Sequence, residues 1–392
     1  MAMTRPLAGI TVISLEQAIA APFCTRQLAD LGARVIKIER PGPGDFARAY
    51  DTRVRGLSSH FVWTNRSKES LTLDVKAPGA TPVMEGLLAR ADVLVQNLAP
   101  GAAARLGLDY ETLSARYPRL IVCDISGYGG DGPYRDKKAY DLLVQSESGF
   151  VSVTGTAEEG VKAGASVADI AAGMYAYSNI LAALIERGQT GRGKRIDVSM
   201  LESMVEWMSF PMYYAFDGAE PPPRAGAAHA TIYPYGPFPT GDGKTVMLGL
   251  QNEREWSVFC KTVLGEPALA THAAFATNSL RSANRAQLRA RIVEAFSHMT
   301  AEQVVQRLEE AKIANANVNT MADVWHHPQL AARERWRTVA SPVGEIPALL
   351  PPGLTDARMD PIPAVGQHTD AILAEIGCSA AQVAQLHADG VV

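Results

Sequence analysis

The N-terminal part of the chain alternates between β-branched apolar runs and helical patterns, and this order limits the fold more than any other feature. Residues 10–15 and 34–38 read as strands, and Pro22 suits the first turn of the helix between them. Further apolar runs with helical patterns between them follow at residues 71–75, 93–95 and 120–125. Continuous apolar runs are typical of strands that are buried on both faces. We therefore expect an α/β fold with a parallel sheet covered by helices.

The composition is that of an ordinary globular protein. The chain has 392 residues, of which 47% are apolar and 20% charged, and its formal net charge is −4. That balance excludes a basic surface for nucleic acid, so we expect no nucleic acid partner. The longest weakly polar stretch, Ile170–Ile185, is shorter than the ~20 apolar residues of a membrane span, and we expect a buried core helix there and no membrane partner.

Cysteines and histidines give no sign of a metal site or a disulfide framework. The four cysteines contain no CxxC pair, and the N-terminus lacks the apolar core of a signal peptide. We expect a reduced, cytoplasmic protein. His326 and His327 are adjacent and precede a proline, which is not the spacing of metal ligands, so no metal is expected.

A Pro-rich and Gly-rich segment, DGAEPPPRAGAAH at residues 217–229, divides the chain. A hairpin pattern with its turn at Asp242-Gly243 follows, and then several helical patterns. The domains expected from these patterns are an N-terminal large domain at 1–205, a linker at 206–229, a small α+β domain at 230–322 and a C-terminal return to the large domain at 323–392.

The strand–helix–strand start invites a dinucleotide-binding interpretation, since Glu39 closes the second strand where an acidic residue would meet a ribose. However, the loop LEQAIAAPFCTRQ contains no GxGxxG, and the chain has no GxxxxGK[ST] motif. Phosphates would therefore have to be bound by side chains. The candidates are Arg40, Lys76, Arg105 and Lys138, each of which, taken alone, is more often a solvated surface charge than a ligand contact.

Asp169 lies among small residues in GASVADIAAGMYA, at the expected start of a long apolar helix. The helix dipole favours the ionised form of a carboxylate there. From the residues alone, an N-cap or first-turn aspartate is the more frequent explanation. The alternative is a carboxylate nucleophile that the helix end keeps ionised and that small neighbours leave open to a substrate.

Several long segments in order resemble the family III CoA-transferases, which include formyl-CoA transferase, carnitine CoA-transferase and the related α-methylacyl-CoA racemases. The segments are PLAGITVISL, APFCTRQLADLGARVIKIERPGPGD, NRSKESLTLDVK, ADVLVQNLAPGAAARLG, KKAYDLLVQSESG, SVADIAAGMYA and ERGQTGRGKRIDVSML. The resemblance covers nearly the whole chain. It implies a Rossmann-like large domain built from both chain ends, a smaller α+β domain and an interlocked homodimer.

The resemblance also implies the site. Asp169 matches the catalytic aspartate, which would accept the acyl group as an anhydride and then carry CoA as a thioester. Coenzyme A is a substrate, no tightly bound cofactor is expected, and acyl-CoA and carboxylic acids are the small-molecule partners. The positions that match the CoA-binding surface are Gln17, Ala20, Arg40, Leu73, Lys76, Asn97, Leu98, Arg105, Lys138, Tyr140 and Asp141.

The N-terminal segments are most similar to mesaconyl-CoA transferases and related enzymes that act on C4 and C5 dicarboxylates. The sequence leaves open whether CoA moves between two molecules or between two carboxyl groups of one molecule. The second carboxylate of such a substrate would be bound best by an arginine, for which the candidates are Arg26, Arg48 and Arg53. The region Gly249–Glu255 lacks the glycine run of formyl-CoA transferase, which argues against formyl or oxalyl substrates. Two alternatives remain: a racemase, although Tyr140 stands where racemases have histidine, and a non-catalytic acyl-CoA-binding protein.

Overall fold

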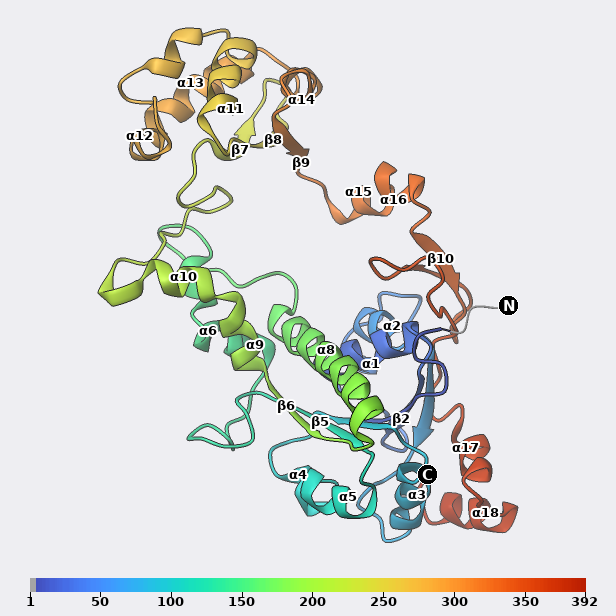
Figure 1. The fold of residues 1–392 in the computed structure, drawn as a ribbon. Coiled ribbons are helices and arrows are strands. Elements are labelled where there is room, and N and C mark those ends of the chain that lie inside the picture. Colours follow the sequence, from blue (N-terminus) through green and yellow to red (C-terminus); the bar gives the residue numbers. More distant parts are fainter. Residues whose placement is uncertain (1–4) are drawn as a thin grey trace. The chain divides into compact units, whose positions relative to one another are not determined.

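The computed structural model describes residues 5–392 and divides them into two compact units (Figure 1). The first unit contains the residues up to Gly149, Ala163–Met208 and Gln329–Val392, so it combines both ends of the chain. The second contains Phe150–Lys162 and Ser209–Pro328. The sequence-based division placed the boundaries at 205/206 and 322/323 and assigned 150–162 to the large domain.

A six-stranded parallel sheet forms the centre of the first unit, in the order β3-β2-β1-β4-β5-β6. Its strands are β1 (Thr11–Leu15), β2 (Arg34–Glu39), β3 (Lys68–Thr72), β4 (Val93–Gln96), β5 (Ile121–Ser126) and β6 (Arg195–Ser199). The expected parallel sheet is confirmed. The third strand begins earlier than predicted because the buried, ion-paired Lys68 belongs to it. The edge strand β6 escaped prediction because its alternating sequence RIDVS lacks a continuous apolar run.

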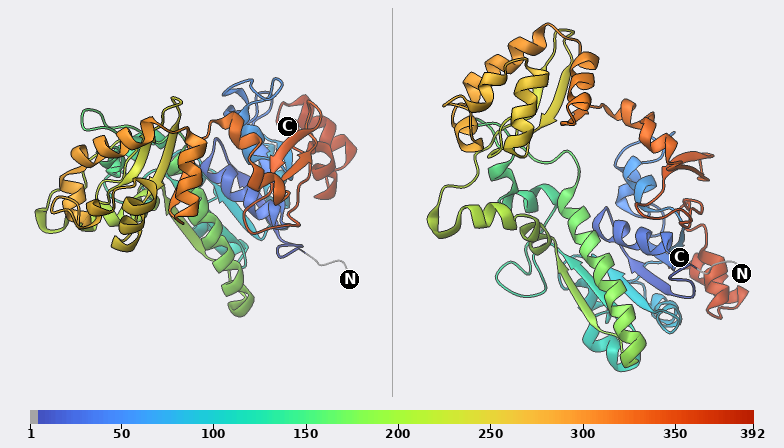
Figure 2. Two further views of the ribbon diagram at one scale, coloured as in Figure 1. Left: turned by 90° about the horizontal axis from the view of Figure 1, so that it is seen from above. Right: turned by 45° about the horizontal axis from the view of Figure 1, so that its top comes forward.

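Helices cover both faces of this sheet, and two of them lie side by side on one face, α1 (Ala20–Asp30) and α8 (Val167–Thr190) (Figures 1 and 2). Alternate strand residues such as Ile13 and Ile36 point to the other face, where they share a core with Leu87 of α3. The remaining helices of this part are η1 (Phe46–Ala49), α2 (Ser59–Thr64), α3 (Ala80–Leu88), α4 (Ala102–Arg105), α5 (Tyr110–Arg116), α6 (Asp141–Glu147) and α9 (Met200–Trp207).

Helix α8 differs from the sequence-based expectation in length and burial. It has 24 residues, longer than the stretch considered from the sequence, and it buries one side while Ile185 is 67% exposed. Within the described residues it is long and apolar enough to be counted as a possible membrane span, although the core helix of a soluble protein meets the same criterion. The expected buried core helix is therefore present with one buried face, which packs against α1 and the sheet.

The C-terminal segment packs against the rest of the first unit. A two-stranded antiparallel ribbon, β10 (Trp336–Val339) with β11 (Ile346–Leu349), precedes helices α17 (Thr369–Glu375) and α18 (Ala380–Ala388). Ile372 and Val391 enter the core that contains Leu87. A short helix, α16 (Pro328–Ala332), joins the two units in sequence.

The second unit contains an antiparallel sheet in the order β7-β8-β9, and the expected hairpin around Asp242-Gly243 is present. Trp256 and Phe296 are buried in its own core. Its strands are β7 (Tyr235–Pro239), β8 (Thr245–Gly249) and β9 (Ala314–Asn317). Its helices are α7 (Phe150–Val153), α10 (Ser209–Tyr214), η2 (Phe216–Gly218), α11 (Glu253–Val258), η3 (Phe259–Val263), η4 (Pro267–Thr271), α12 (Asn278–Ala283), α13 (Arg285–Ser297), α14 (Ala301–Glu310) and α15 (Met321–Trp325).

Candidate active site

The β1–α1 loop lies at the carboxyl edge of the sheet, where β1 pairs with β2 on one side and β4 on the other. In doubly wound sheets this change of direction opens a crevice for ligands. Asn97, directly after β4, holds the loop with two hydrogen bonds: its Oδ1 accepts from the N–H of Gln17 at 2.9 Å, and its Nδ2 donates to the Gln17 carbonyl at 2.9 Å. Both residues are on the predicted CoA surface, and the fold brings them together.

A pocket at this edge collects further predicted residues. Gln17, Arg40, Leu73 and Leu98 line it, although they come from the ends of different strands. Leu73 is buried, whereas Arg40 is exposed at the end of β2. The pocket is lined by apolar side chains and by the carboxylates of Glu16, Glu39 and Asp45, and the guanidinium of Arg40 lies beside it. A guanidinium is suited to a phosphate group.

Three predicted cations do not line this pocket. Lys76, Arg105 and Lys138 are exposed on separate segments of the first unit. Arg105 is the last residue of the short helix α4. Contacts of these three with CoA stay a prediction.

Asp169 occupies the first turn of α8, and the N-terminus of that helix is capped from another helix. The Oδ1 of Asp141 accepts from the N–H of Ala168 at 2.8 Å and from the N–H of Asp169 at 3.4 Å. Its Oδ2 accepts from Nε2 of Gln145 at 2.6 Å. Asp141 therefore supports the helix end that carries Asp169, and both of its oxygens are engaged inside the protein.

The carboxyl of Asp169 is less acidic than an ordinary aspartate. Burial and then the negative charge of Asp141 raise the pKa of Asp169 to about 7, although a hydrogen bond from the backbone N–H of Ala20 opposes this shift. The expectation that the helix end keeps Asp169 ionised is therefore wrong in direction. Desolvation and the like charge of Asp141 therefore outweigh the stabilisation expected from the helix end.

Ala20 lies close to Asp169 because two helices approach each other tightly. It is the first residue of α1, so its N–H has no partner within that helix. At the crossing, α8 has a glycine, Gly173, and a Cβ placed there would lie 2.7 Å from the carbonyl oxygen of Ala20. The small residues flanking Asp169 thus allow the start of α1 to reach the carboxylate.

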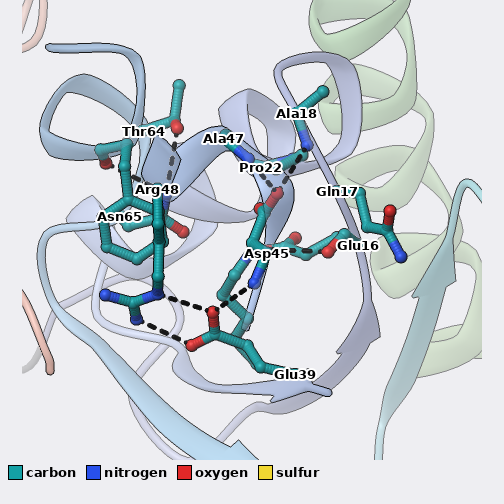
Figure 3. A network of polar contacts seen from close by, with 12 residues as sticks. Glu16, Gln17, Ala18, Pro22, Glu39, Asp45, Ala47, Arg48, Thr64 and Asn65 are labelled. Carbon is teal, nitrogen blue, oxygen red and sulfur yellow. Dashed lines mark hydrogen bonds and ion pairs between the residues drawn. The ribbon is translucent and has the colours of Figure 1, made fainter. Parts of the chain in front are cut away.

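Charged side chains are buried beneath the loop, and the sequence analysis did not predict this (Figure 3). We call them the buried charge cluster; its members are Glu16, Lys37, Glu39, Asp45, Arg48 and Lys68. Nζ of Lys68 donates to Oε1 of Glu16 at 2.6 Å, and Nζ of Lys37 donates to Oδ2 of Asp45 at 2.8 Å. Three carboxylates face three cations, so the charges balance. The sequence signal is Lys37, which stands between Ile36 and Ile38 in β2; Lys68, the first residue of β3, has no comparable signal.

Glu39 links this cluster to the sheet and to Arg48. Nε and Nη2 of Arg48 each donate to the Glu39 carboxylate at 2.8 Å, and Oγ of Ser70 donates to it at 2.6 Å. Although burial opposes it, these hydrogen bonds and the charge of Lys37 lower the pKa of Glu39 to about 2. Glu39 is thus committed to protein contacts.

Two of the three arginines considered for a distal carboxylate are also committed. Arg26 is buried and pairs with Asp30 at 3.0 Å, and Arg48 pairs with Glu39. Arg53 is exposed and lies in the loop that follows η1. Of the three, Arg53 is the arginine that has no carboxylate partner among the ion pairs of the described residues.

Tyr50 is a further neighbour of Asp169 that the sequence did not reveal. Burial, followed by the charges of Asp45 and Asp169, raises the pKa of the Tyr50 phenol to about 12. The ring is 47% exposed, and Tyr140, whose proximity also contributes, is 70% exposed. Tyr50 is thus an exposed phenol close enough to Asp169 to sense its charge.

A parallel sheet in this order, a pocket at its change of direction and a carboxylate at a helix start are typical of an α/β enzyme that binds its ligand at the carboxyl edge of the sheet. The family model described as CoA-transferase family III matches residues 7–369. The chain therefore belongs to this family and is a CoA-transferase, as the sequence resemblance predicted.

Individual relatives agree with this assignment. Human succinyl-CoA:glutarate CoA-transferase is 34% identical over 380 residues, 95% of this chain and 86% of that protein. Succinyl-CoA:mesaconate CoA-transferase of Haloarcula marismortui is 32% identical over 388 residues, 95% of this chain and 96% of that protein. The crystal structure of a CAIB/BAIF family protein from Brucella suis is 34% identical, with a TM-score of 0.83 over 95% of this chain and 100% of that one.

Proposed function

We propose that Asp169 is the nucleophile of this CoA-transferase and that CoA passes through it as a thioester. The observation that carries the proposal is the position of this carboxylate: it lies in the first turn of α8, beside the N–H of Ala20 at the start of α1, on the sheet edge that holds the pocket. Helix N-termini stabilise the negative oxygen that forms when a carboxylate attacks a thioester.

The proposed reaction begins when an Asp169 oxygen attacks the thioester carbon of the donor. The C–S bond breaks, which leaves a mixed anhydride and CoA thiolate. The thiolate then attacks the Asp169 carbonyl carbon, so that the donor acid departs and an aspartyl-CoA thioester remains. The acceptor carboxylate repeats these steps in reverse and regenerates Asp169. No net proton transfer occurs, and the scheme needs neither a metal nor a cofactor besides CoA.

We place the CoA nucleotide in the pocket of Gln17, Arg40, Leu73 and Leu98. Arg40 is suited to a phosphate because its guanidinium is exposed at the pocket. Lys76, Arg105 and Lys138 extend this surface in the proposal, and Ala20, Asn97, Tyr140 and Asp141 border its acyl end.

For the substrates we propose succinyl-CoA and C4 or C5 dicarboxylic acids of the glutarate or mesaconate type. The support is the human and Haloarcula relatives, whose names state these acids, together with Arg53, which is exposed and has no carboxylate partner among the ion pairs of the described residues. An arginine that meets the second carboxylate would distinguish these acids from monocarboxylates.

The two units then correspond to a large CoA-binding domain, built from both chain ends, and a smaller α+β domain. We propose that two copies interlock as a homodimer in the cytoplasm. The four cysteines are free, which suits a reducing compartment. Light scattering should give a dimer at every concentration that retains activity, and a folded, active monomer would contradict this part.

A trapping experiment tests the nucleophile. The protein is incubated with succinyl-CoA and hydroxylamine, which converts an aspartyl thioester into a hydroxamate, and the peptide that contains Asp169 is analysed by mass spectrometry. Modification at Asp169 is expected in the wild type, and loss of transfer is expected in Asp169→Ala. The matched control is Glu186→Gln, an exposed carboxylate at the other end of α8.

The alternatives give different results. A racemase would exchange the α-proton of a methyl-branched acyl-CoA with solvent, and a non-catalytic acyl-CoA-binding protein would bind CoA esters without transfer. Full activity of Asp169→Ala would exclude the proposed nucleophile.

A further inference from the structure

The loop between β1 and α1 contains a residue in a conformation that side chains rarely adopt. Ala18 has a φ of 61°, in the left-handed region, although it is not a glycine. This conformation is unfavourable for a residue with a Cβ, so contacts of the loop must offset its cost. Ala18 precedes the first residue of α1 by two positions, and its geometry sets the direction in which that helix begins.

The contact that holds Ala18 comes from Asp45. Its Oδ1 accepts from the N–H of Ala18 at 3.2 Å and from the N–H of Ala47 at 2.9 Å (Figure 3). Its Oδ2 accepts from Nζ of Lys37 at 2.8 Å. The side chains of Asp45 and Lys37 are fully buried. Both oxygens are therefore fixed, and so is the peptide between Gln17 and Ala18.

Lys37 fixes the same loop from a second side. Its Nζ also lies 3.3 Å from the carbonyl oxygen of Glu16, to which it donates. Asn97 holds Gln17 from the neighbouring strand. The loop is thus bound at three consecutive residues before the helix begins.

A buried ion pair is weak evidence for a stabilising role, because well-packed apolar side chains of similar volume are often as stable. Here the pair is oriented toward backbone groups of one loop, and that loop leads to the N–H that meets Asp169. The start of α1 has little freedom of its own, since a Cβ on Gly173 would lie 2.7 Å from the Ala20 carbonyl oxygen.

We propose that Asp45, oriented by Lys37, is a positioning residue for the transferase reaction: it holds Ala18 in the left-handed conformation and thereby directs the N–H of Ala20 to the Asp169 carboxylate. This rests on the proposed role of Asp169. Asp45 contacts the loop and not the reacting atoms, so its effect reaches the chemistry through the backbone.

The test combines three variants. Asp45→Ala removes the acceptor for Ala18 and is expected to lower kcat roughly tenfold, with a smaller change in the KM for acyl-CoA. Ala18→Val, which leaves the buried charges in place but disfavours a positive φ, is expected to lower kcat in the same way. The double variant Asp45→Ala with Ala18→Gly should recover most of the lost kcat, because glycine adopts this conformation readily.

Asp92→Ala is the matched control. The Asp92 carboxylate also accepts a backbone N–H, that of Thr11 at 2.8 Å, and pairs with Arg187 at 2.8 Å, but it precedes β4 at the opposite edge of the sheet. A purely structural role would make the two aspartate variants behave alike. We expect that Asp92→Ala lowers stability and leaves the pH profile unchanged.

The decisive measurement does not need activity. Infrared difference spectra of isotope-labelled aspartate, assigned by subtracting the Asp169→Asn spectrum, report the titration of the Asp169 carboxyl in each variant. We expect Asp45→Ala and Ala18→Val to move this titration to higher pH, since the N–H of Ala20 is lost, and the double variant to return it. Unchanged titration and unchanged kcat in Ala18→Val, or no recovery in the double variant, would overturn the proposal. If Asp169→Ala still transfers CoA, the proposed nucleophile fails, while the titrations still decide the role of Asp45.

Discussion

Asp141 and Asp169 oppose each other electrostatically while they share one helix end. The Oδ1 of Asp141 accepts from the N–H of Asp169 at 3.4 Å, and the charge on Asp141 adds to burial in raising the pKa of the Asp169 carboxyl to about 7. The residue that stabilises the start of α8 thus keeps the candidate nucleophile partly protonated at neutral pH in the free protein. Several measurable consequences depend on this and on the charges nearby.

The first prediction concerns the pH dependence of transfer. Attack requires the ionised form of Asp169, so kcat/KM should rise with pH and level off above the pKa of about 7. Asp141→Asn removes the like charge and keeps a capping side chain, so it should move the acid limb to lower pH by up to about 1 unit. Initial rates of succinyl-CoA consumption from acid to alkaline pH measure this. A limb in Asp141→Asn at higher pH than in the wild type would contradict it.

The second prediction concerns stability. The pKa of Asp169 is raised in the folded state from 3.8 to about 7, so the folded protein binds this proton more tightly than the unfolded chain, and stability is lost as pH rises through that interval. Asp169→Asn has no such group. It should be more stable than the wild type by roughly 1–3 kcal/mol at pH 8, with little difference near pH 4. Denaturant unfolding at both pH values tests this, and an equal difference at the two would refute it.

The third prediction concerns the pair of Glu39 and Arg48. Arg48→Met leaves a buried carboxylate without its main partner and should destabilise the protein by about 3–5 kcal/mol at neutral pH. Because the pKa of Glu39 is lowered from 4.5 to about 2, the contribution of this group is present above pH 4.5 and is lost as pH falls through about 2. Arg116→Met is the control, since its pair with Glu85 is exposed to solvent and should contribute little to stability.

The fourth prediction concerns the exposed guanidinium beside the pocket. Arg40→Gln removes one charge-assisted contact with a CoA phosphate and should raise the KM for acyl-CoA roughly tenfold with little change in kcat. Arg192→Gln, in the exposed turn before β6 and distant from the carboxyl edge of the sheet, should change neither constant. A large fall in kcat with unchanged KM would show that Arg40 acts elsewhere.

The fifth prediction concerns substrate choice. Succinyl-CoA with a C4 or C5 dicarboxylate should react faster than formyl-CoA with oxalate, and acetate or butyrate should lose roughly ten- to a hundredfold in kcat/KM because they lack the second carboxylate. Arg53→Gln should reduce the difference in kcat/KM between dicarboxylates and monocarboxylates. The matched comparison is Arg55→Gln in the same loop. Equal rates for monocarboxylates and dicarboxylates would rule out this choice.

The sequence by itself determined the parts of the protein that depend on local pattern. Continuous apolar runs specified the parallel sheet, Asp242-Gly243 specified the hairpin, and the ordered segments specified the family. The sequence also predicted Asp169 in the first turn of a long helix, because small residues flank it and a helical pattern of apolar residues follows it. Each of these depends on neighbours in the chain.

Only the tertiary structure decided the electrostatics of the site. Asp141 binds the start of α8 although it precedes Ala168 by 27 positions in the chain, so no local pattern could show that it raises the pKa of Asp169. Lys37 pairs with Asp45 across a loop, and no local pattern could show that this pair fixes the β1–α1 loop. The same holds for Arg48, which looked like a free cation and is bound to Glu39. Charge interactions depend on the distance between the groups and on their burial. That distance and that burial are set only when distant segments pack together.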